Sequence, residues 1–368
     1  MAQQPADTDE ASEAALHALA EAGRQGACLV PVGAGIRQHP LEAWDTRPVV
    51  PWASTRFQTI RRWSVPDLTV EVDAGLPWED LNRRLAQHGQ WLPVGVPDGA
   101  PDTLGGIVSA GVNGVWTGGY LSIRDRILSI TVAVPAFGVV RVGAPVVKNV
   151  AGYNLWRLYW ATRGTFGIVL TITWKLAALP RATATLTCGD SGSLTGRVWE
   201  EAGRWGASIP TVPALAALLL TIHPSGWELV GIAHGGDRAM DRLRRTLGAQ
   251  VGAGPDVARP AALSDRLVWQ ARLPREGQRL VLEALSRWGA SARAELQSGM
   301  VWGYGQQPDG ASQEMAQLVA RHGGTFRYWD GPWRGLRVPP AEVDMWQRLK
   351  TGMDLQGVLP GWRAEAEA

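Results

Sequence analysis

The second half of the chain repeats one order of hydrophobic patterns twice. Alternating or β-branched runs predict strands, and apolar residues spaced three and four apart predict helices. The first pass predicts strand 182–188, helix 194–205, strands 214–221 and 227–233, helix 238–247 and strand 250–251. The second predicts strand 266–272, helix 275–288, strands 292–296 and 300–304, helix 312–322 and strand 325–329. Each pass is a β-α-β-β-α-β unit, so the pair predicts one broad antiparallel sheet with its helices on one face.

The first half has a less regular pattern, and it predicts a mixed α+β domain. Helices are expected at 9–23, closed by Gly23, at 77–88, and from about Tyr153 onward; strands are expected at 27–33, 68–72, 127–134, 139–142 and 167–176. Strands and helices do not alternate regularly, which disfavours the doubly wound dinucleotide-binding fold. The predicted domains are 1–181, 182–338 as a ferredoxin-like cap, and a C-terminal helix and tail at 339–368 that return to the first domain.

Composition narrows the class of protein. At 368 residues the chain has room for two domains, and a net charge of +2 from 36 basic and 34 acidic residues points to neither nucleic acid nor an anionic membrane. Cys28 and Cys188 are the only cysteines, so neither a disulfide framework nor a cysteine-based metal site is expected. The apolar stretch 212–222 is too short to span a membrane. We expect a cytoplasmic protein without membrane insertion.

Two further features concern aromatic residues and glycines. Nineteen tryptophans are spread along the chain, and filling core and interface volume is their commonest role. Between 101 and 175, glycines stand singly or in pairs between short apolar runs, as where a backbone passes close to another group. After the strand at 27–33, the sequence GAGIR adds bare N–H groups that suit an anion. These patterns favour a chain wrapped around a bulky, phosphate-bearing cofactor.

Four segments resemble the FAD-binding domain of the vanillyl-alcohol-oxidase, or PCMH-type, flavoproteins. They are PDTLGGIVSAGVNG at 101–114, the Arg124–Asp125 pair, VVKNVAGYNLWRL at 146–158, and RGTFGIVLTITWKL at 163–176. Within them, VKNVAGY resembles the signature of the FAD-binding E subunits of bacterial glycolate oxidases. The ending MWQRLKTGMDLQGVLPGW is similar to the closing helix and loop of that family. The resemblance implies two α+β subdomains that hold an extended FAD, followed by a cap domain.

The resemblance also implies which residues hold the FAD. The pyrophosphate is expected on the loop from Pro31 to Arg37. The full set of implied contacts is Pro31, Gly33, Ala34, Gly35, Ile36 and Arg37; Thr103, Gly105, Gly106, Gly111, Asn113 and Gly114; and Gly164, Thr165, Gly167 and Ile168. Ile168 is expected to pair its backbone with the adenine. Backbone N–H groups of such loops suit a pyrophosphate because they donate without bulk.

Several positions depart from the family pattern. Ala34 and Ile36 stand where the family has glycine and threonine; loss of the threonine hydroxyl costs about 1 kcal/mol of phosphate hydrogen bonding, which Arg37 would offset as a charged donor. Asn154 replaces an aspartate, and Ala161-Thr162-Arg163 replace a turn that contains Gly-Ser. No histidine occupies the loop position used for covalent attachment, and His39 lies further on. The expected FAD is therefore non-covalent.

The sequence assigns no catalytic residue and no metal ligand. Lys148 and Asn149 fit a capped turn as well as they fit a contact with the cofactor or a partner. Tyr153 fits a core aromatic as well as a contact with the isoalloxazine ring of the flavin. Arg124–Asp125 is expected to be a structural ion pair. His223, His234 and His322 adjoin proline or glycine and are interpreted as turn residues. Oxidation of a 2-hydroxy acid needs a base for the hydroxyl proton and a cation for the carboxylate, and the sequence places neither.

The first functional hypothesis is an FAD-binding subunit of a glycolate oxidase. It would relay electrons from the oxidation of glycolate to glyoxylate, together with a larger FAD-containing subunit and an iron–sulfur subunit. Those partners would hold it at the inner face of the membrane. The alternatives are a stand-alone FAD-linked oxidase of a small hydroxy acid or alcohol, and a scaffold subunit that has lost FAD.

Overall fold

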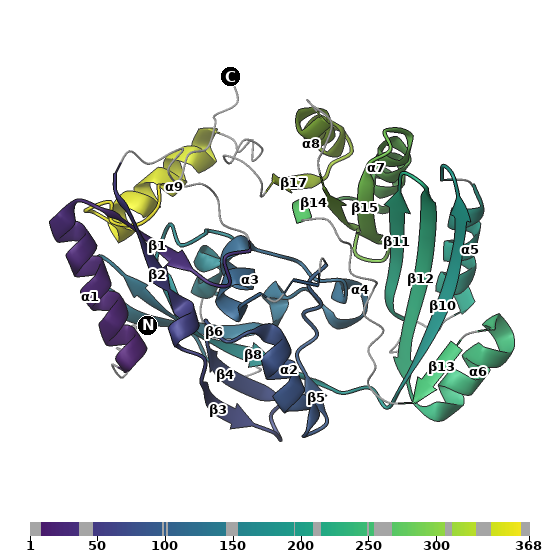
Figure 1. Ribbon diagram of the computed structural model, residues 1–368, viewed down its shortest axis with the longest axis horizontal. Helices are drawn as coiled ribbons and strands as arrows, with labels where there is room; N and C mark the ends of the chain where they lie inside the picture. The colour runs from purple at the N-terminus through teal and green to yellow at the C-terminus, as the bar shows by residue number, and fades with distance from the viewer. Residues whose placement is uncertain are drawn as a thin grey trace.

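The computed structural model describes residues 9–36, 47–97, 99–100, 102–144, 154–194, 196–208, 215–248, 250–253, 267–305, 311–328 and 340–361. Across these ranges, strands gather into two large sheets, one in each half of the chain. The sheet of the second half stands over one side of the first half, and the C-terminal helix lies on the opposite side (Figure 1). The predicted mixture of helices and antiparallel sheets is confirmed.

The large sheet of the first half is antiparallel throughout. Its strands are β3 (Ile60–Ser64), β4 (Thr69–Asp73), β6 (Ile127–Val134), β7 (Gly138–Gly143) and β8 (Ile168–Lys175). They lie in the order β3-β4-β8-β6-β7. In β8, Ile172 and Trp174 enter the core, whereas Thr171 and Thr173 form hydroxyl hydrogen bonds of 2.8 Å to β6. Because side chains alternate along a strand, one face of β8 is apolar and packs in the core, and the other face carries hydroxyl groups that bond to β6.

Smaller elements surround this sheet. They are α1 (Glu10–Gln25), β1 (Cys28–Val32), β2 (Val49–Ala53), η2 (Ser54–Arg56), α2 (Trp78–Ala86), β5 (Gln90–Trp91), α3 (Leu104–Ala110), α4 (Thr117–Tyr120), η3 (Arg124–Arg126), η4 (Leu155–Tyr159) and β9 (Ala177–Ala178). β1 and β2 pair in parallel, and β5 pairs with β9. α1 packs with β1 in a core of its own.

Two boundaries in the first half differ from the prediction. α1 ends at Gly26 rather than Gly23, because Gly26 adopts the left-handed conformation (φ +61°) that closes a helix. Gly23 remains helical and lies against Gln356 and Val358 of the tail. The helix expected from about Tyr153 is a short 3-10 helix, η4. The signature VKNVAGY at 147–153 lies outside the described residues.

The second half forms the predicted duplicated sheet. Its elements are β10 (Ala182–Ser191), α5 (Gly196–Ser208), β11 (Leu215–His223), β12 (Gly226–Gly235), α6 (Asp237–Leu247) and β13 (Gln250–Ala253), then β14 (Leu267–Arg272), α7 (Arg275–Arg287), β15 (Ser291–Glu295), β16 (Met300–Tyr304), α8 (Ala311–Arg321) and β17 (Thr325–Tyr328). The strand order β13-β10-β12-β11-β15-β16-β14-β17 is the same four-strand arrangement twice, joined edge to edge. We call this eight-stranded unit the cap sheet.

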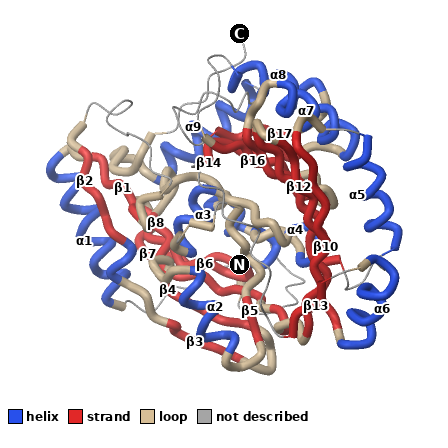
Figure 2. Tube along the Cα trace, turned by 45° about the vertical axis from the view of Figure 1, so that its right-hand side comes forward, coloured by secondary structure: helices blue, strands red, loops and turns tan. Residues whose placement is uncertain are grey.

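The two faces of the cap sheet have different neighbours. Helices α5 to α8 cover its outer face (Figure 2), where Trp269, Leu282 and Val301 are among the fully buried residues. The inner face turns toward the first half, and Trp302, Met300 and Leu219 join the core of that half. Polar residues between the apolar ones on this inner face, such as Gln270 and Arg327, therefore meet the first half directly.

Helix α9 (Pro340–Met353) brings the C-terminal segment back onto the first half, beside α1 and β1 (Figure 1). Trp346 stacks on Phe166, with ring centroids 5.1 Å apart. After α9, Val358 accepts a 2.7 Å hydrogen bond from the backbone N–H of Leu29 in β1. The exact domain limits proposed from the sequence stay a prediction, but these contacts place the C-terminal segment against β1 and the turn before β8.

Candidate functional site

The loop after β1 lies against the start of α3. A Cβ added to Gly33 would overlap the Thr103 hydroxyl and lie 3.7 Å from Gly106 Cα. Thr103 caps α3, since its hydroxyl accepts the Gly106 N–H at 3.1 Å. The loop itself is accessible: Ala34 and Gly35 are exposed, and Gly33 and Ile36 are half-buried. Arg37 lies outside the described residues. Two segments that are some seventy positions apart in the sequence therefore form one accessible, glycine-lined surface.

The turn before β8 completes this surface. A Cβ on Gly164 would lie 2.8 Å from Pro31 Cγ, which places the turn beside the loop after β1. The backbone N–H groups of Ala161 and Arg163 donate to Val108 and Ser109 of α3, both at 2.9 Å. Ala161 and Arg163 both have positive φ, +65° and +52°, a backbone conformation that is uncommon for residues other than glycine. The residues 31–36, 103–114 and 161–168 thus gather in one place, which we call the glycine cradle.

Not every glycine of the cradle faces open space. A Cβ on Gly105 would lie 2.8 Å from Ala74 Cβ, one on Gly167 would lie 2.5 Å from Val132 Cγ1, and one on Gly114 would overlap the Val94 carbonyl oxygen. Those three glycines are required by the packing of the chain itself. Thr165 is buried, and its carbonyl accepts a hydrogen bond from Lys350. Ile168 begins β8 opposite Ala133, with its side chain in the core beside α1.

The cap sheet holds one end of the cradle. Gln270 of β14 donates to the Gly111 carbonyl at 2.9 Å and accepts the Asn113 N–H at 3.2 Å. Arg327 of β17 donates to the same carbonyl at 3.1 Å. Gly111 has φ +66°, and an added Cβ would overlap the Arg327 guanidinium. Glycine at this position therefore permits both the backbone conformation and the close approach of a cation.

A cavity of about 190 Å³ opens between the cap sheet and the first half. It is lined by Asn113, Ser122, Arg124, Trp160, Gln270, Ala271, Arg272, Met300, Thr325, Phe326 and Arg327. Among the described lining residues there is neither a carboxylate nor an imidazole. We call this space the arginine cavity. Its polar groups are mainly hydrogen-bond donors, which is the chemistry that recognises a small anion.

The guanidinium groups near this cavity repel one another. Burial, together with a smaller contribution from the charge of Arg124, lowers the pKa of Arg327 to about 10. Burial also lowers the pKa of Arg163 to about 9, with an added contribution from Arg327. Both groups remain cations at pH 7. The Nε atoms of Arg124 and Arg327 are buried and have no hydrogen-bond partner among the described residues. An anion bound between these arginines would relieve both the repulsion and the missing hydrogen bonds.

The Arg124–Asp125 pair is present but weak. Its closest N–O distance is 3.9 Å, and both side chains are about two-fifths exposed. Asp125 instead accepts the Ser122 hydroxyl at 2.6 Å. An exposed pair at this distance contributes little to stability, so the Arg124 guanidinium is not held away from the cavity by Asp125.

His234 is a correction to the sequence interpretation. It was expected in a turn, because glycines follow it, but β12 continues through it and its side chain is buried. The Tyr120 hydroxyl lies 2.7 Å from His234 Nδ1, and Trp91 and Trp116 surround the ring. Burial lowers the pKa of His234 to about 4, so the imidazole is neutral at pH 7. His234 therefore joins the cap sheet to α4 of the first half.

Four candidates from the sequence cannot be placed, and two arginines of the cap sheet were not among the candidates. His39, Lys148, Asn149 and Tyr153 lie outside the described residues. The sequence does not identify Arg272 and Arg327 as candidates. Polar residues at alternate positions of the strands at 267–272 and 325–328 were the available signal, because they indicate that one face of these strands is polar. No local signal indicated that Arg327 and Gln270 would meet the backbone of Gly111 and Asn113.

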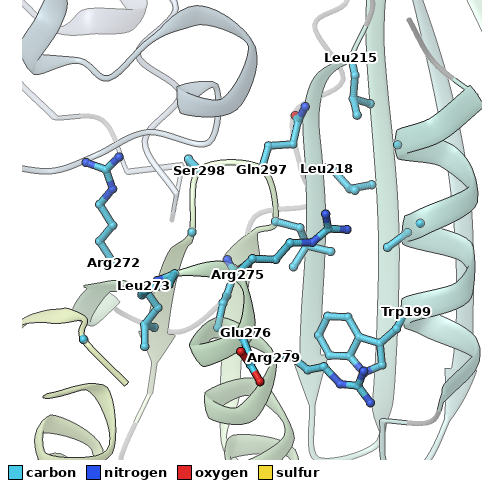
Figure 3. A pocket seen from close by; sticks show the side chains of 18 of the residues that line it. Trp199, Leu215, Leu218, Arg272, Leu273, Arg275, Glu276, Arg279, Gln297 and Ser298 are labelled. Atoms are coloured by element: carbon cyan, nitrogen blue, oxygen red, sulfur yellow. The ribbon is translucent and has the colours of Figure 1, made fainter. Parts of the chain in front are cut away.

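A second cavity, of about 1300 Å³, lies on the outer side of the cap sheet between α5 and α7 (Figure 3). Trp199 of α5 meets Arg279 of α7 there, with the guanidinium carbon 5.5 Å from the ring centroid. Although this cavity is larger, it contains none of the cradle residues. The cradle and the arginine cavity are therefore the better candidates for chemistry.

In the described part of the chain, no group of three or more His, Cys, Asp or Glu residues is arranged to hold a metal ion. Within the same ranges, none of the helices has the length and apolar character needed to cross a membrane.

The sequence is similar to known FAD-binding proteins, and one match extends over most of the chain. Residues 4–143, which include two of the three cradle segments, match the family described as FAD binding domain. Glycolate oxidase subunit GlcE of Escherichia coli is 28% identical over 318 residues, covering 82% of this chain and 83% of the relative. The mitochondrial D-lactate dehydrogenases [cytochrome] of Arabidopsis thaliana and Saccharomyces cerevisiae are 30% and 36% identical over 132 and 116 residues.

The extent of these matches differs. The two D-lactate dehydrogenase matches cover 36% and 32% of this chain but only 23% and 19% of those enzymes, so the chain spans about a fifth of their length. A solved structure of alkyldihydroxyacetonephosphate synthase superposes with a TM-score of 0.64 at 15% identity, covering 95% of this chain and 75% of that one. The fold is therefore shared over nearly the whole chain, including the cap sheet.

Proposed function

Since this chain carries a PCMH-type FAD-binding domain and belongs with the FAD-binding oxidoreductases, we propose that it is the FAD-holding subunit of an enzyme complex that oxidises a small 2-hydroxy acid. Glycolate, oxidised to glyoxylate, is the first candidate substrate. The observation that carries the proposal is the match to a glycolate oxidase subunit, which extends over 82% of this chain and therefore includes the cap sheet. The D-lactate dehydrogenases match only about a third of the chain.

The glycine cradle fits the cofactor. Gly33 lies directly against the Thr103 hydroxyl, where a larger residue would clash, and the adjacent residues Ala34 and Gly35 are exposed. In this proposal the backbone of 33–36 and the segment beginning at Thr103 hold the pyrophosphate, and 111–114 lie along the part nearest the cap sheet. The assignment of all sixteen contact residues, Arg37 included, stays part of the proposal. FAD, when bound, supplies the two-electron acceptor chemistry that none of the protein's side chains offers.

The arginine cavity supports a role for an organic acid. Arg124, Arg272 and Arg327 would bind the carboxylate of a hydroxy acid or its oxo-acid product by charge-assisted hydrogen bonds. Gln270 would orient the ligand, since it is fixed by two hydrogen bonds to the 111–113 segment. The apolar members of the lining, Met300, Phe326 and Trp160, would exclude water from the bound acid.

The proposed partners are a larger FAD-containing subunit and an iron–sulfur subunit. The relative that matches most of this chain is itself named as one subunit of glycolate oxidase, and the GlcD subunit of Bacillus subtilis is 30% identical over 120 residues. Location in the cytoplasm, at the inner membrane face through these partners, belongs to the same proposal.

A stand-alone oxidase is the second candidate, and the arginine cavity favours it because this chain builds the cavity without a partner. Anaerobic mixing with glycolate separates the two. The subunit proposal predicts that FAD in the isolated chain stays oxidised, with its visible absorbance intact, and that bleaching occurs when the chain is co-purified with its partners. Bleaching of the isolated chain within seconds would favour the stand-alone enzyme. A chain that binds no FAD would contradict both.

A further inference from the structure

Lys350 of α9 joins parts of the molecule that are far apart in the sequence. Its Nζ donates to the Thr165 carbonyl at 2.9 Å, to Asp354 Oδ2 at 2.6 Å and to the Leu359 carbonyl at 3.2 Å. An ammonium group has three N–H donors, so each has a partner. The Lys350 side chain is 17% exposed and that of Asp354 is 0% exposed. The pair is therefore a buried, fully hydrogen-bonded group rather than a surface ion pair.

Asp354 extends the network into the C-terminal tail. Its Oδ1 accepts the Val358 N–H at 2.8 Å and its Oδ2 accepts the Leu359 N–H at 2.9 Å. Val358 in turn accepts the Leu29 N–H of β1 at 2.7 Å. Both Val358 and Leu359 are buried in the core that contains Leu29. The tail is thus fixed against the strand that leads into Gly33.

The same helix holds the turn before β8. Lys350 reaches the Thr165 carbonyl, and Trp346, one turn earlier, stacks on Phe166 with the rings only 8° from parallel. Thr165 follows Gly164, which lies against Pro31. One ammonium group therefore connects two segments of the cradle: the turn at 161–168 directly, and the loop at 31–36 through the tail and β1.

We propose that Lys350 is a positioning residue for FAD. By fixing Thr165 and the tail together, it sets the separation between the turn at 161–168 and the loop at 31–36. The C-terminal segment 340–361 then helps to position the cofactor site, although the match to the FAD-binding family ends at residue 143. The inference requires that the chain binds FAD, but it does not depend on the substrate or the partners.

The test compares two variants of the same helix. Lys350→Met removes all three hydrogen bonds, whereas Arg348→Met removes an exposed residue that pairs with Asp344, 2.7 Å away on the same helix. Fluorescence titration of the apoproteins is expected to give a dissociation constant for FAD that is about tenfold larger in Lys350→Met. That factor is a typical size for coupling between linked sites. Arg348→Met is expected to stay within about twofold of the unaltered chain.

A second variant separates positioning from stability. In Lys350→Met the Asp354 carboxylate is left without its cation, which also destabilises the fold. Lys350→Met combined with Asp354→Asn removes the buried charge but keeps only one of the two amide hydrogen bonds that Asp354 accepts, so the melting temperature of the apoprotein is expected to recover in part while FAD affinity stays weak. A merely structural role predicts the reverse, namely that affinity returns with stability. Unchanged FAD affinity in a folded Lys350→Met variant would also overturn the proposal.

Hydrogen exchange provides a test that needs no variant. FAD binding is expected to slow exchange of the Val358 and Leu359 amides severalfold, because coupling between two sites acts in both directions. Identical exchange with and without FAD would overturn the proposal, even if Lys350→Met failed to fold. If the unaltered chain bound no FAD, the inference would fall together with the proposed function. FAD binding by the chain, without reduction by glycolate even in the complex with its partners, would contradict only the latter.

Discussion

The glycine cradle and the arginine cavity adjoin at Gly111, yet they are built by opposite means. The cradle is built from three backbone segments whose glycines allow close packing against one another and against neighbouring side chains. The cavity presents charged side chains from the cap sheet, with Arg272 and Arg327 beside Arg124 of the first half. Backbone donors tolerate changes of side chain but not added bulk, whereas side-chain donors are lost with a single substitution. The two regions are thus sensitive to different mutations.

The largest effect is expected where a cradle glycine serves the fold. Gly114→Ala would force a Cβ into the Val94 carbonyl oxygen, and backbone cannot shift as readily as a side-chain end. We expect the free energy of unfolding to fall by about 3 kcal/mol, the upper range for overpacking. Chemical denaturation measures it. Gly203→Ala is the control, since its Cβ has open space on α5 and alanine favours a helix. Equal stability of Gly114→Ala and the unaltered chain would contradict this packing.

Acid is expected to weaken the contact between the cap sheet and the first half. The pKa of His234 is lowered to about 4 from 6.5, so the folded chain takes up this proton less readily than the unfolded one. Its stabilising contribution is complete above pH 6.5 and is lost as the pH falls toward 4, by about 3 kcal/mol.

Denaturation between pH 7 and pH 4 tests this loss. The slope of stability against pH should be shallower in His234→Asn than in the unaltered chain. His223→Asn, at the end of the neighbouring strand β11, should keep the original slope. A His234→Asn variant with the original slope would show that the imidazole is not held neutral by burial.

Removing one guanidinium should affect the cavity more than the cradle. For Arg327→Met we expect binding of oxalate, a small carboxylate probe, to weaken about 30-fold, the equivalent of a charged hydrogen bond of about 2 kcal/mol. Calorimetry of the FAD-loaded protein measures it. Arg275→Met, which changes the outer cavity instead, should leave oxalate binding unchanged. Equal losses in both variants would mean that net charge alone, rather than the arginine cavity, attracts the anion.

The smallest effect is expected at the cradle's open edge. In Gly33→Ala the added Cβ overlaps the Thr103 hydroxyl, which can move at moderate cost. We expect FAD affinity about tenfold weaker, with oxalate binding to the FAD-saturated protein unchanged. Fluorescence titration under identical conditions compares the two ligands. Loss of oxalate binding with FAD still saturated would show that the two regions are not separable.

The sequence predicts the cap sheet and the cradle segments from local patterns. It does not predict the arginine cavity, which depends on contacts between distant segments. The two βαββαβ passes follow from local periodicity, and the glycines of 101–114 follow from local spacing. Arg327 and Gly111 are 216 positions apart, and no local pattern reports which strand of a duplicated sheet will face which loop. The glycine neighbours of His234 resemble a turn, but pairing of His234 with Thr183 of β10 continues the strand.

The departures from the family pattern have a structural context but not a full explanation. Ala161, in the segment 161–163 that replaces the family's Gly-Ser turn, adopts positive φ, a conformation that costs alanine about 1 kcal/mol or more. Its N–H is nevertheless bonded to Val108, and the turn is held by Lys350 through Thr165. Nothing in the structure explains why Ile36 replaces a threonine.

The central claim is that the cradle holds one non-covalent FAD per chain. Titration of the apoprotein with FAD, followed by heat denaturation and spectroscopy of the supernatant, tests it most directly. We predict a sharp end point at one FAD per chain, a visible flavin band in the complex, and full release of intact FAD on denaturation. A protein that stays colourless at saturating FAD, or a flavin that remains with the denatured chain, would contradict the account.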